Sequence, residues 1–371
     1  MKLKVLFTAS TFSHICHFHL PYLRAFREKG WVVHVACGGT PIDIDDADEV
    51  FYVPFQKKMS SSKNFQAAAT LRSKISAEGY DLVCTHTSLA SFFTRLALWG
   101  MKERPKVVNM VHGYLFDDKT AFGKRSILLL AELITAPQTD LLLTMNHWDF
   151  ETAKRYKLGK RVSMIPGIGV DFSKFDVAKQ QDPSSLRDFL GIRKDAFVLM
   201  YAAEFSKRKN QETIIRALTK LPDHVILILA GDGIMKKDCE ILVEKLGLCN
   251  RVLFPGYIKD IPNWYCISDV VISASRSEGL PFNIMEALYL RKPIVASNVK
   301  GHTDLSAVSQ LITLFRYGDS SACFDAILKL LESENTEFTK DDSYPPKMDR
   351  YSLTHVLPIV MREYESVLTE F

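Results

Sequence analysis

The sequence predicts an α/β protein built from two doubly wound domains in tandem, each a parallel sheet with helices on both faces. Three observations favour this class. Short β-branched or leucine-rich runs alternate with longer amphipathic runs, this alternation stops over residues 171–195 and then restarts, and 371 residues are too many for one core. Because such sheets bind ligands beyond the carboxyl ends of their strands, we expect the two domains to face a common cleft.

The first domain is expected to contain six strands with amphipathic helices between them. The N-terminal run M-K-L-K-V-L-F-T-A-S has a very short apolar stretch and no small-residue cleavage site, so we interpret it as a strand and not as a signal peptide. The expected strands are 3–9, 31–37, 81–85, 106–111, 141–144 and 162–165. The clearest helical patterns are 20–28, 65–78 and 88–98.

The second domain follows residues 171–195, which are polar, lack a sustained period and predict a linker or hinge. Its expected strands are 197–202, 225–230, 251–254, 270–274 and 293–297. The polar stretch 332–347 predicts an exposed loop before a last helix over about 351–368. These patterns divide the chain into domains of residues 1–172 and 173–350, with a C-terminal helix in 351–371 that packs back toward the first domain.

Composition excludes several classes of protein. Hydrophobic residues make up 47% and charged residues 24% of the chain, which excludes a disordered protein. The longest apolar runs, such as residues 127–131, are far shorter than the ~20 residues that span a bilayer. The seven cysteines are scattered and odd in number, which favours free thiols in a reducing compartment. We therefore expect a cytoplasmic protein.

Charge differs between the two halves of the chain. Residues 1–180 carry 24 Lys and Arg against 17 Asp and Glu, whereas residues 181–371 carry 23 against 26. Either this is ordinary variation between solvated faces, or the first half faces an anionic membrane surface or a lipid phosphate. The segment 122–135, F-G-K-R-S-I-L-L-L-A-E-L-I-T, is either a membrane-facing helix or a helix buried in the core. No basic patch with interleaved aromatic residues indicates nucleic-acid binding.

The most informative segment is S-R-S-E-G-L-P-F-N-I-M-E-A-L at residues 275–288, which follows a buried strand. Gly279 permits a tight turn and Pro281 suits a first helical turn, so Glu278 precedes the helix and Glu286 lies inside it. The amides of a helix start bind phosphate or another anion. Carboxylates accept hydrogen bonds from sugar and ribose hydroxyls. The segment therefore predicts a site for a ligand that carries both phosphate and hydroxyl groups.

Three further motifs follow expected strands. The run A-E-F-S-K-R-K-N at 203–210 places Lys207, Arg208 and Lys209 where they either clamp a diphosphate or form a solvated basic helix start. Gly231 belongs to the short turn A-G-D-G, a weak signal by itself. His112, in V-H-G, ends an apolar strand and is either a hydrogen-bonded core residue or an active-site residue at a strand's carboxyl end.

A last motif, S-H-I-C-H-F-H-L-P at residues 13–21, holds three histidines and a cysteine within six positions. His14, Cys16, His17 and His19 are together enough ligands for a tetrahedral zinc site. The residues alone leave three interpretations open: a zinc site, a loop that binds substrate, and local packing at a helix start.

The sequence E-G-L-P-F-N-I-M-E at 278–286 resembles the E-x7-E signature of the family-4 retaining glycosyltransferases, which have the GT-B fold of two tandem Rossmann-like domains. Other pieces resemble the branch that builds bacterial capsular and exopolysaccharides, and they occur in the family's order over nearly the whole chain. They are S-H-I-x-x-F-H-x-P-Y-L, T-H-T at 85–87, V-H-G, I-P-G-I-G-V-D at 165–171, K-N at 209–210, L-F-P-G-Y-I-K-D-I at 253–261, S-D at 268–269 and G-H-T-D-L at 301–305.

The resemblance implies a function and its residues. It implies retaining transfer of a hexose or N-acetylhexosamine from a nucleotide diphosphate sugar, commonly UDP-linked, to a lipid-diphosphate-linked sugar. Residues 1–172 would bind the acceptor and 173–350 the donor. Glu278 would contact the donor sugar, Glu286 the ribose, Lys209 the diphosphate, and His112 the transferred sugar. The remaining donor contacts that the resemblance implies are Tyr257, Ile258, Gly279, Leu280, Pro281, Phe282 and Asn283. From their positions after strands of the second domain, Glu204 and Gly231 are also expected to lie at the donor site.

One departure from the family pattern concerns the diphosphate. Many members place an arginine after the glycine of the strand end that here reads Ala203–Glu204. Glu204 is not an obvious phosphate ligand, so Lys207 or Arg208 is expected to share that task with Lys209.

The implied mechanism needs no metal or other cofactor, because fixed positive charge stabilises the leaving diphosphate, which itself takes the acceptor's proton. Within the histidine motif, Cys16 and His17 stand where the branch's pattern is loose, and a four-ligand site would need both. We therefore expect no metal site and assign His14 and His19 to acceptor or donor-phosphate contacts.

Two alternatives are kept. One is a nucleotide-sugar 2-epimerase on the same architecture, which would epimerise free nucleotide sugar without an acceptor. The other is a non-catalytic partner subunit of a true transferase, which would fail to bind any nucleotide.

Overall fold

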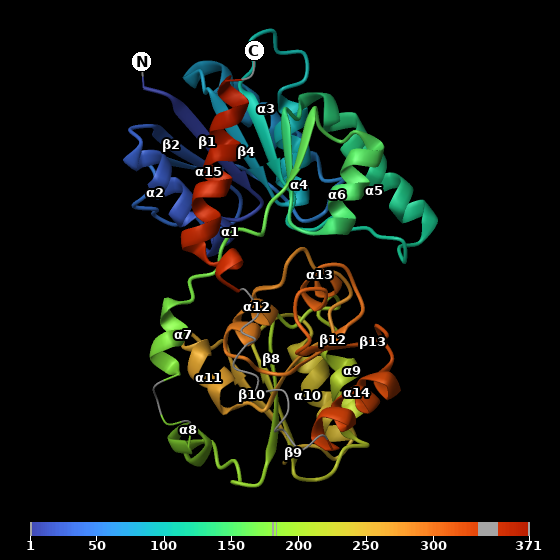
Figure 1. Ribbon diagram of the computed structural model, residues 1–371. Coiled ribbons are helices and arrows are strands. Elements are labelled where there is room, and N and C mark those ends of the chain that lie inside the picture. The colour runs from blue at the N-terminus through green and yellow to red at the C-terminus, as the bar shows by residue number, and fades with distance from the viewer. Residues whose placement is uncertain (1, 180–181, 183, 333–347, 370–371) are drawn as a thin grey trace. The chain divides into compact units, whose positions relative to one another are not determined.

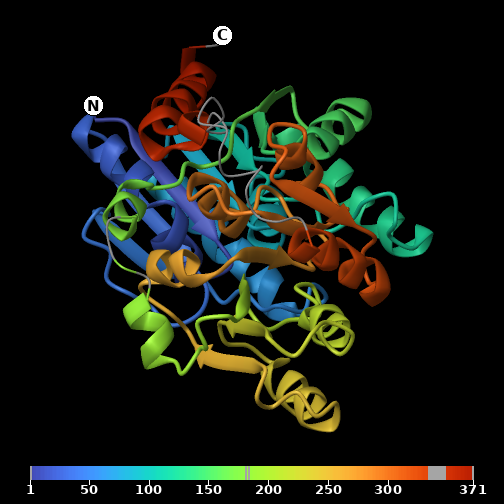
Figure 2. The same cartoon turned by 60° about the horizontal axis from the view of Figure 1, so that its bottom comes forward.

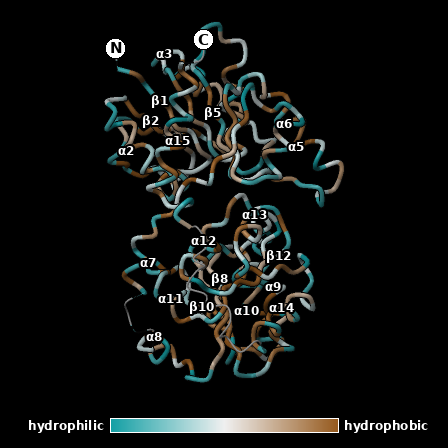
Figure 3. The backbone as a smooth tube through the Cα atoms, viewed as in Figure 1, coloured by the Kyte–Doolittle hydropathy of each residue, from teal (hydrophilic) through white to brown (hydrophobic). Residues whose placement is uncertain are grey.

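The computed structural model describes residues 2–179, 182, 184–332 and 348–369, and it separates the chain into two compact units (Figure 1). Unit 1 comprises Met1–Gly169 and Thr354–Phe371, and unit 2 comprises Val170–Leu353. Each unit is an α/β domain around a parallel sheet, which confirms the predicted fold class. Figure 3 shows the hydrophobic residues gathered on the strands inside each unit.

Unit 1 contains a seven-stranded sheet in the order β3-β2-β1-β4-β5-β6-β7. All of its strand pairs are parallel. Its strands are β1 (Lys4–Ala9), β2 (Val32–Cys37), β3 (Glu49–Tyr52), β4 (Leu82–His86), β5 (Lys106–Met110), β6 (Leu141–Thr144) and β7 (Arg161–Met164). Its helices are α1 (Phe12–Phe18), α2 (Leu20–Glu28), α3 (Ser62–Glu78), α4 (Ser88–Ala97), α5 (Phe122–Thr135), the 3₁₀ turn Ala136–Gln138, α6 (His147–Tyr156) and α15 (Leu353–Thr369). The strand order reverses between β1 and β4, which makes that edge the switch point where such sheets bind ligands.

The last helix, α15, packs on unit 1 although residues 170–353 separate it from the rest of that unit. It lies beside the β1 and β4 part of the sheet in both ribbon views (Figures 1 and 2). Tyr364 of α15 is fully buried, and its ring lies within 6.3 Å of the rings of Phe7, Tyr22 and Phe26. Glu363 receives hydrogen bonds from Arg161 and Ser163. Aromatic burial and these polar contacts hold α15 on the unit.

Unit 2 contains a six-stranded sheet in the order β10-β9-β8-β11-β12-β13, with the switch point between β8 and β11. All of its strand pairs are parallel. Its strands are β8 (Phe197–Ala202), β9 (Val225–Ala230), β10 (Val252–Gly256), β11 (Val270–Ser273), β12 (Ile294–Ser297) and β13 (Ile312–Phe315). Its helices are α7 (Ser173–Ala178), α8 (Ser184–Phe189), α9 (Gln211–Leu218), α10 (Lys236–Lys245), α11 (Ile261–Ile267), α12 (Phe282–Tyr289), α13 (His302–Ser306), α14 (Ser320–Glu332) and the 3₁₀ turn Met348–Tyr351.

Some predictions about elements are wrong. The expected linker 171–195 contains α7 and α8, each six residues long and therefore too short to show a helical period. Phe175 of α7 is fully buried, and its ring stacks 6.4 Å from that of Tyr265, so α7 belongs to unit 2. The sequence also missed β3 and β13, which are four residues long. The expected loop 332–347 lies, except for residue 332, outside the described residues.

Across the described part of the chain, none of the helices combines the length and apolar character that crossing a bilayer requires.

Candidate functional site

The switch point of unit 2 brings together two loops that the sequence singled out. The loop after β8 carries Lys209, and the loop after β11 carries Glu278. Tyr201 at the end of β8 connects them, because its hydroxyl donates to the Lys209 carbonyl at 3.0 Å and lies 3.0 Å from the Ser275 hydroxyl. The amide of Arg276 also donates to the Arg208 carbonyl at 2.7 Å. Residues about 70 positions apart are therefore fixed against each other.

Two cations share one carboxylate in this site. The Nζ of Lys209 lies 2.5 Å from Oε1 of Glu278, and Nη1 of Arg208 lies 3.1 Å from Oε2. The side chains of Glu278 and Lys209 are 9% and 13% exposed, so water screens the pair weakly. Burial alone would raise the pKa of Glu278, but the charges of Lys209 and Arg208 outweigh it and lower that pKa to about 2. Glu278 is ionised at neutral pH.

Close backbone packing positions the Glu278 turn. Gly301, at φ +82°, packs directly against this turn. A Cβ on it would lie 2.6 Å from the Gly279 carbonyl oxygen and 3.2 Å from Cβ of Glu278. Gly231 is packed in the same way, since a Cβ there would lie 2.1 Å from the Ala203 carbonyl oxygen. At both positions only glycine fits. These glycines let neighbouring loops pack tightly around the ion pair.

Glu286 of α12 has a different environment from Glu278. It is buried, its Oε2 accepts a hydrogen bond of 3.3 Å from Tyr265, and its Oε1 lies 4.0 Å from Nζ of Lys174. Burial raises the pKa of Glu286, and the distant lysine offsets this only partly. Asn283, one turn earlier, donates to the Ala202 carbonyl at 3.4 Å and so connects α12 to β8. Tyr265 and Lys174 were not predicted, because neither stands in a motif.

The other predicted donor residues differ in exposure. Glu204, Lys207 and Tyr257 are exposed side chains, Tyr257 at 65%. The Glu204 carbonyl accepts from Gln211 at 2.9 Å, while its carboxylate belongs to an exposed side chain. Leu280, Pro281 and Gly279 are buried in the turn before α12, and Phe282 and Ile258 are half-buried. The site as a whole offers fixed cations, carboxylates and a helix start, which suit a ligand with phosphate and hydroxyl groups.

The switch point of unit 1 holds a cluster of four imidazoles, which we call the histidine cluster: His14, His19, His86 and His112. His14 lies in α1, His19 between α1 and α2, His86 ends β4 and His112 follows β5. The ring centroids of His19 and His86 are 3.8 Å apart, those of His14 and His112 are 4.7 Å apart, and Nε2 of His112 lies 3.4 Å from Nδ1 of His86. The sequence predicted sites at three of these residues. It missed His86, whose T-H-T motif at a strand end was the available signal.

Several nitrogens of the cluster find no hydrogen-bond partner among the residues that the structure describes. They are Nε2 of His14, both ring nitrogens of His19 and Nε2 of His86. Burial lowers the pKa of His14 to about 4 and lowers the pKa values of the other three well below the usual range, so the rings are neutral. Thr87, next to His86, has φ +64°, which is strained for a β-branched residue. Unpaired buried groups and a strained residue at the same sheet edge make this edge a candidate site, since each such group calls for an explanation.

Cys16 and His17 do not join the histidine cluster. His17 is exposed, and its Nδ1 lies 2.6 Å from the Ser13 carbonyl oxygen. The residue that joins His14 and His19 is instead His112, which comes from outside the motif at residues 13–21. That the protein uses no metal stays a prediction.

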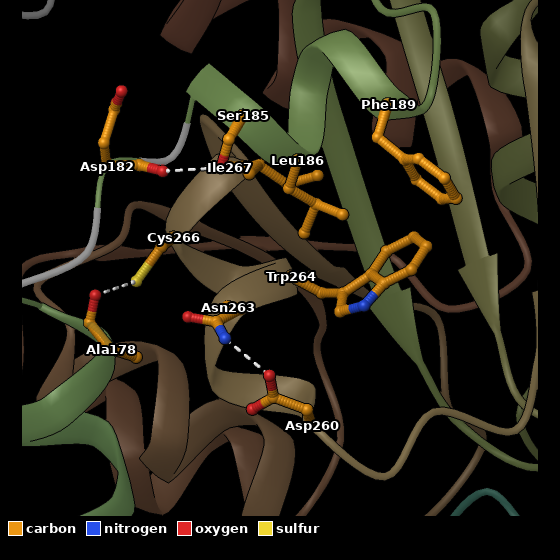
Figure 4. Close-up of a pocket in the computed structure, with 10 residues that line it drawn as sticks. All are labelled: Ala178, Asp182, Ser185, Leu186, Phe189, Asp260, Asn263, Trp264, Cys266 and Ile267. Carbon is orange, nitrogen blue, oxygen red and sulfur yellow. Dashed lines mark hydrogen bonds between the residues drawn. The ribbon is translucent and has the colours of Figure 1, made fainter.

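A separate pocket of about 310 Å³ opens between α8 and α11 of unit 2 (Figure 4). Leu186 and Phe189 of α8 and Trp264 of α11 form its apolar side, and Asn263 donates to Asp260 at 2.5 Å on the other side. None of the predicted donor or acceptor residues lines it. The pocket is not part of the candidate site.

Comparison with protein families gives two matches that together cover most of the chain. The family described as Glycosyltransferase Family 4 matches residues 22–173, and the family described as Glycosyl transferases group 1 matches residues 183–342.

Two curated relatives are similar over most of their length. A Bacillus subtilis (strain 168) protein, EpsD, named as a glycosyltransferase, is 32% identical over 87% of this chain and 86% of its own. The UDP-Gal:alpha-D-GlcNAc-diphosphoundecaprenol alpha-1,3-galactosyltransferase of Escherichia coli is 30% identical over 71% of this chain and 69% of its own.

Solved structures share the fold at lower identity. The Anabaena protein HepE, solved in complex with UDP and glucose, matches with a TM-score of 0.78 and 20% identity over 98% of this chain and all of its own. Sucrose-phosphate synthase from Thermosynechococcus elongatus matches with a TM-score of 0.79 and 17% identity over 99% of this chain and all of its own.

Proposed function

The chain belongs to glycosyltransferase family 4, and from this membership we propose that it transfers a hexose or N-acetylhexosamine from a UDP-sugar to a lipid-diphosphate-linked sugar, with retention of configuration. The acceptor class is suggested by the Escherichia coli relative, whose name states transfer from UDP-Gal to a GlcNAc-diphosphoundecaprenol. The expected role is in surface polysaccharide synthesis, at the cytoplasmic face of the membrane.

One observation carries the proposal for the donor, namely the ion-pair cluster at the unit 2 switch point, in which the buried Glu278 carboxylate pairs with the largely buried Lys209 and the more exposed Arg208. The diphosphate would bind Lys209 and Arg208, with Lys207 and the start of α12 beside them. Glu278 would turn to the sugar hydroxyls and Glu286 would accept hydrogen bonds from the ribose. Gly231, Tyr257 and Ile258 would contact the nucleotide.

The mechanism follows from where charge develops. As the bond from sugar to diphosphate breaks, the sugar becomes oxocarbenium-like and negative charge grows on the leaving diphosphate, where Lys209 and Arg208 stabilise it. The same diphosphate oxygen can take the proton of the acceptor hydroxyl as the new bond forms. Glu278 and Glu286 belong to one turn and helix, so they are not the opposed pair of a retaining glycosidase. No step requires a metal.

Unit 1 would bind the acceptor. We assign to His112 a contact with the transferred sugar and to His14 and His19 contacts with the acceptor, in line with the family resemblance of these residues. Their unpaired nitrogens support a polar ligand at this sheet edge, since such groups gain a partner when a ligand binds.

Helix α5 supports peripheral binding to an anionic membrane. Phe122, Ile127 and Leu130 are 86%, 71% and 56% exposed, so the helix is not buried in the core. Its one carboxylate, Glu132, is buried and accepts a 2.8 Å bond from Arg95. Lys124 is exposed on the same helix. A helix with an exposed apolar face, a lysine near its N-terminus and its carboxylate buried suits the interface of an anionic bilayer.

The donor proposal is tested by calorimetry with a panel of nucleotide sugars on the wild type and on Glu286→Ala. A UDP-sugar should bind the wild type at least about tenfold more tightly than it binds Glu286→Ala, because the variant loses a buried hydrogen bond to the ribose. Equal binding would refute the ribose assignment, and no nucleotide binding at all would favour the non-catalytic partner. Proton NMR of the transfer product reports its anomeric configuration, and inversion would contradict the mechanism. Epimerised free nucleotide sugar would favour the epimerase.

The membrane proposal is tested by flotation with anionic and neutral vesicles at low salt. We expect the wild type to float with anionic vesicles and Phe122→Ser with Ile127→Ser to stay in solution. Phe189→Ser is the matched control, because Phe189 is 83% exposed but belongs to unit 2. Absence of wild-type flotation, or equal loss in the control, would overturn the proposal.

A further inference from the structure

We propose that His14, His19 and His112 bind a divalent transition-metal ion such as Zn²⁺. One ring nitrogen from each of the three residues lies within 4.8 Å of the others. In a tetrahedral zinc site with Zn–N bonds of about 2.0–2.1 Å, the nitrogens lie roughly 3.4 Å apart. The rings must therefore turn inward for the three nitrogens to bind one ion. This inference does not depend on the proposed transferase activity.

The available nitrogens favour a metal over simple packing. Within the described part of the chain, Nε2 of His14 and both nitrogens of His19 have no hydrogen-bond partner, although His19 has 0% exposure. Leaving such groups unpaired costs about 1–3 kcal/mol each, so a bound ion that uses them relieves a real cost. The rings around them belong to Phe7, Phe18, Tyr22 and His86.

The donor set also determines which ions fit. Imidazole suits zinc, copper and nickel, whereas magnesium and calcium require oxygen ligands. Three protein ligands leave a fourth position for water or for a ligand atom. Anion binding is the competing explanation, but it requires charged imidazoles, which burial among aromatic rings disfavours.

His86 is a positioning residue in this proposal. Its Nδ1 lies 3.4 Å from Nε2 of His112, and its ring is tilted by 33° against that of His19, with the ring centroids 3.8 Å apart. It therefore limits the rotation of two of the three ligands, as outer residues of metal sites commonly do.

Metal binding has a consequence that does rest on the proposed function. His112 cannot contact the transferred sugar while its nitrogen is bound to an ion. The ion would thus inhibit a transferase that needs no metal, and a chelator would restore activity. Binding is measured without activity, so failure of the transferase proposal leaves the metal test unchanged.

The experiment uses the full chain without an affinity tag, stripped with a chelator and then incubated with Zn²⁺ and desalted. Elemental analysis should find about one zinc per chain, and Co²⁺ should give the visible absorption of a tetrahedral site with nitrogen ligands. Excess Mg²⁺ should not compete. His14→Gln and His112→Gln should each weaken zinc binding more than about 100-fold, since changes outside the ligand shell already cost 10–100-fold.

His17→Gln is the matched control, because His17 is exposed in the same helix and bonds to a backbone carbonyl. It should bind zinc like the wild type. Thermal unfolding of each metal-free variant checks that it is folded. No stoichiometric binding to the wild type, unchanged binding in both ligand variants, or equal loss in His17→Gln would overturn the proposal.

Discussion

The two switch points share a topology but have opposite chemistry. In unit 2 the polar groups are charged and already paired, Glu278 with Lys209 and Arg208. In unit 1 they are neutral imidazoles, and several of their nitrogens have no hydrogen-bond partner in the described ranges of the chain. A ligand of unit 2 must therefore compete with an existing ion pair, whereas a ligand of unit 1 can bond to buried nitrogens that no described side chain or backbone group engages. Substitutions should consequently act in opposite directions at the two edges.

The largest effect on the transfer rate is expected when Glu278 of unit 2 loses its partner Lys209. Lys209→Met should lower the transfer rate at least about 100-fold, as removal of one charge-stabilising donor does in other enzymes. It should also destabilise unit 2, because Glu278 is left buried with Arg208 alone. Initial rates and calorimetric affinity for UDP measure the effect. Lys220→Met, an exposed lysine of the same unit, is the control, and similar losses in both would contradict the role of Lys209.

The next effect tests the close packing behind Glu278. Gly301→Ala places a Cβ 2.6 Å from the Gly279 carbonyl oxygen, so it should displace the Glu278 turn and destabilise unit 2 by more than about 3 kcal/mol. Gly318→Ala is a matched control, since its φ of +75° is similar but nothing lies within 4 Å of its Cβ. That control should cost only about 1–2 kcal/mol of backbone strain. Urea unfolding measures the free energy of unfolding of both variants. Equal losses would show that the positive φ, and not the close packing, sets the effect of Gly301→Ala.

The sequence predicted where the residues of the unit 2 switch point lie better than it did for unit 1, and the reason is physical. Residues 275–288 form one strand-turn-helix unit, so local spacing is enough to place Glu278 before the helix and Glu286 within it. The Lys209 contact with Glu278 was not predictable from spacing, but both follow neighbouring parallel strands. Strands β8 and β9 were predicted to the residue, because each is a continuous buried run.

The histidine cluster could not be assembled from local spacing. Its members come from α1, the α1–α2 junction, and the ends of β4 and β5. Within the motif 13–21 the sequence suggested Cys16 and His17 as partners of His14, but hydrogen bonding of His17 to Ser13 turns that ring to solvent. Short elements such as β3 and α7 were missed because four to six residues show no reliable period.

A third test uses the pH dependence of unit 2. The pKa of Glu278 is lowered from 4.5 to about 2 on folding, so its stabilisation is present above about pH 4.5 and is lost as pH falls toward 2. At 1.36 kcal/mol per pKa unit this amounts to about 3 kcal/mol. Glu278→Gln should therefore be less stable than the wild type at pH 7, and the difference should disappear near pH 2. Urea unfolding over this range measures it.

Glu212→Gln controls for loss of a surface charge, since Glu212 pairs with Arg216 on an exposed helix face. It should change stability by less than about 1 kcal/mol at every pH. A constant difference between Glu278→Gln and the wild type from pH 7 to 2 would show that the Glu278 ion pair does not set this dependence.

The smallest effect has the opposite sign and belongs to unit 1. In the metal-free protein His19→Phe replaces a fully buried ring whose nitrogens are both unpaired, so it should leave stability unchanged or raise it by about 1 kcal/mol. His34→Phe is the matched control in the same unit, because His34 is buried but its Nδ1 lies 2.7 Å from the Tyr80 hydroxyl. That variant should lose about 1–3 kcal/mol, since it leaves the buried tyrosine without its partner. Thermal unfolding in the presence of a chelator compares the two. If both variants lose stability equally, the nitrogens of His19 have partners in solution, and the contrast between the two switch points fails.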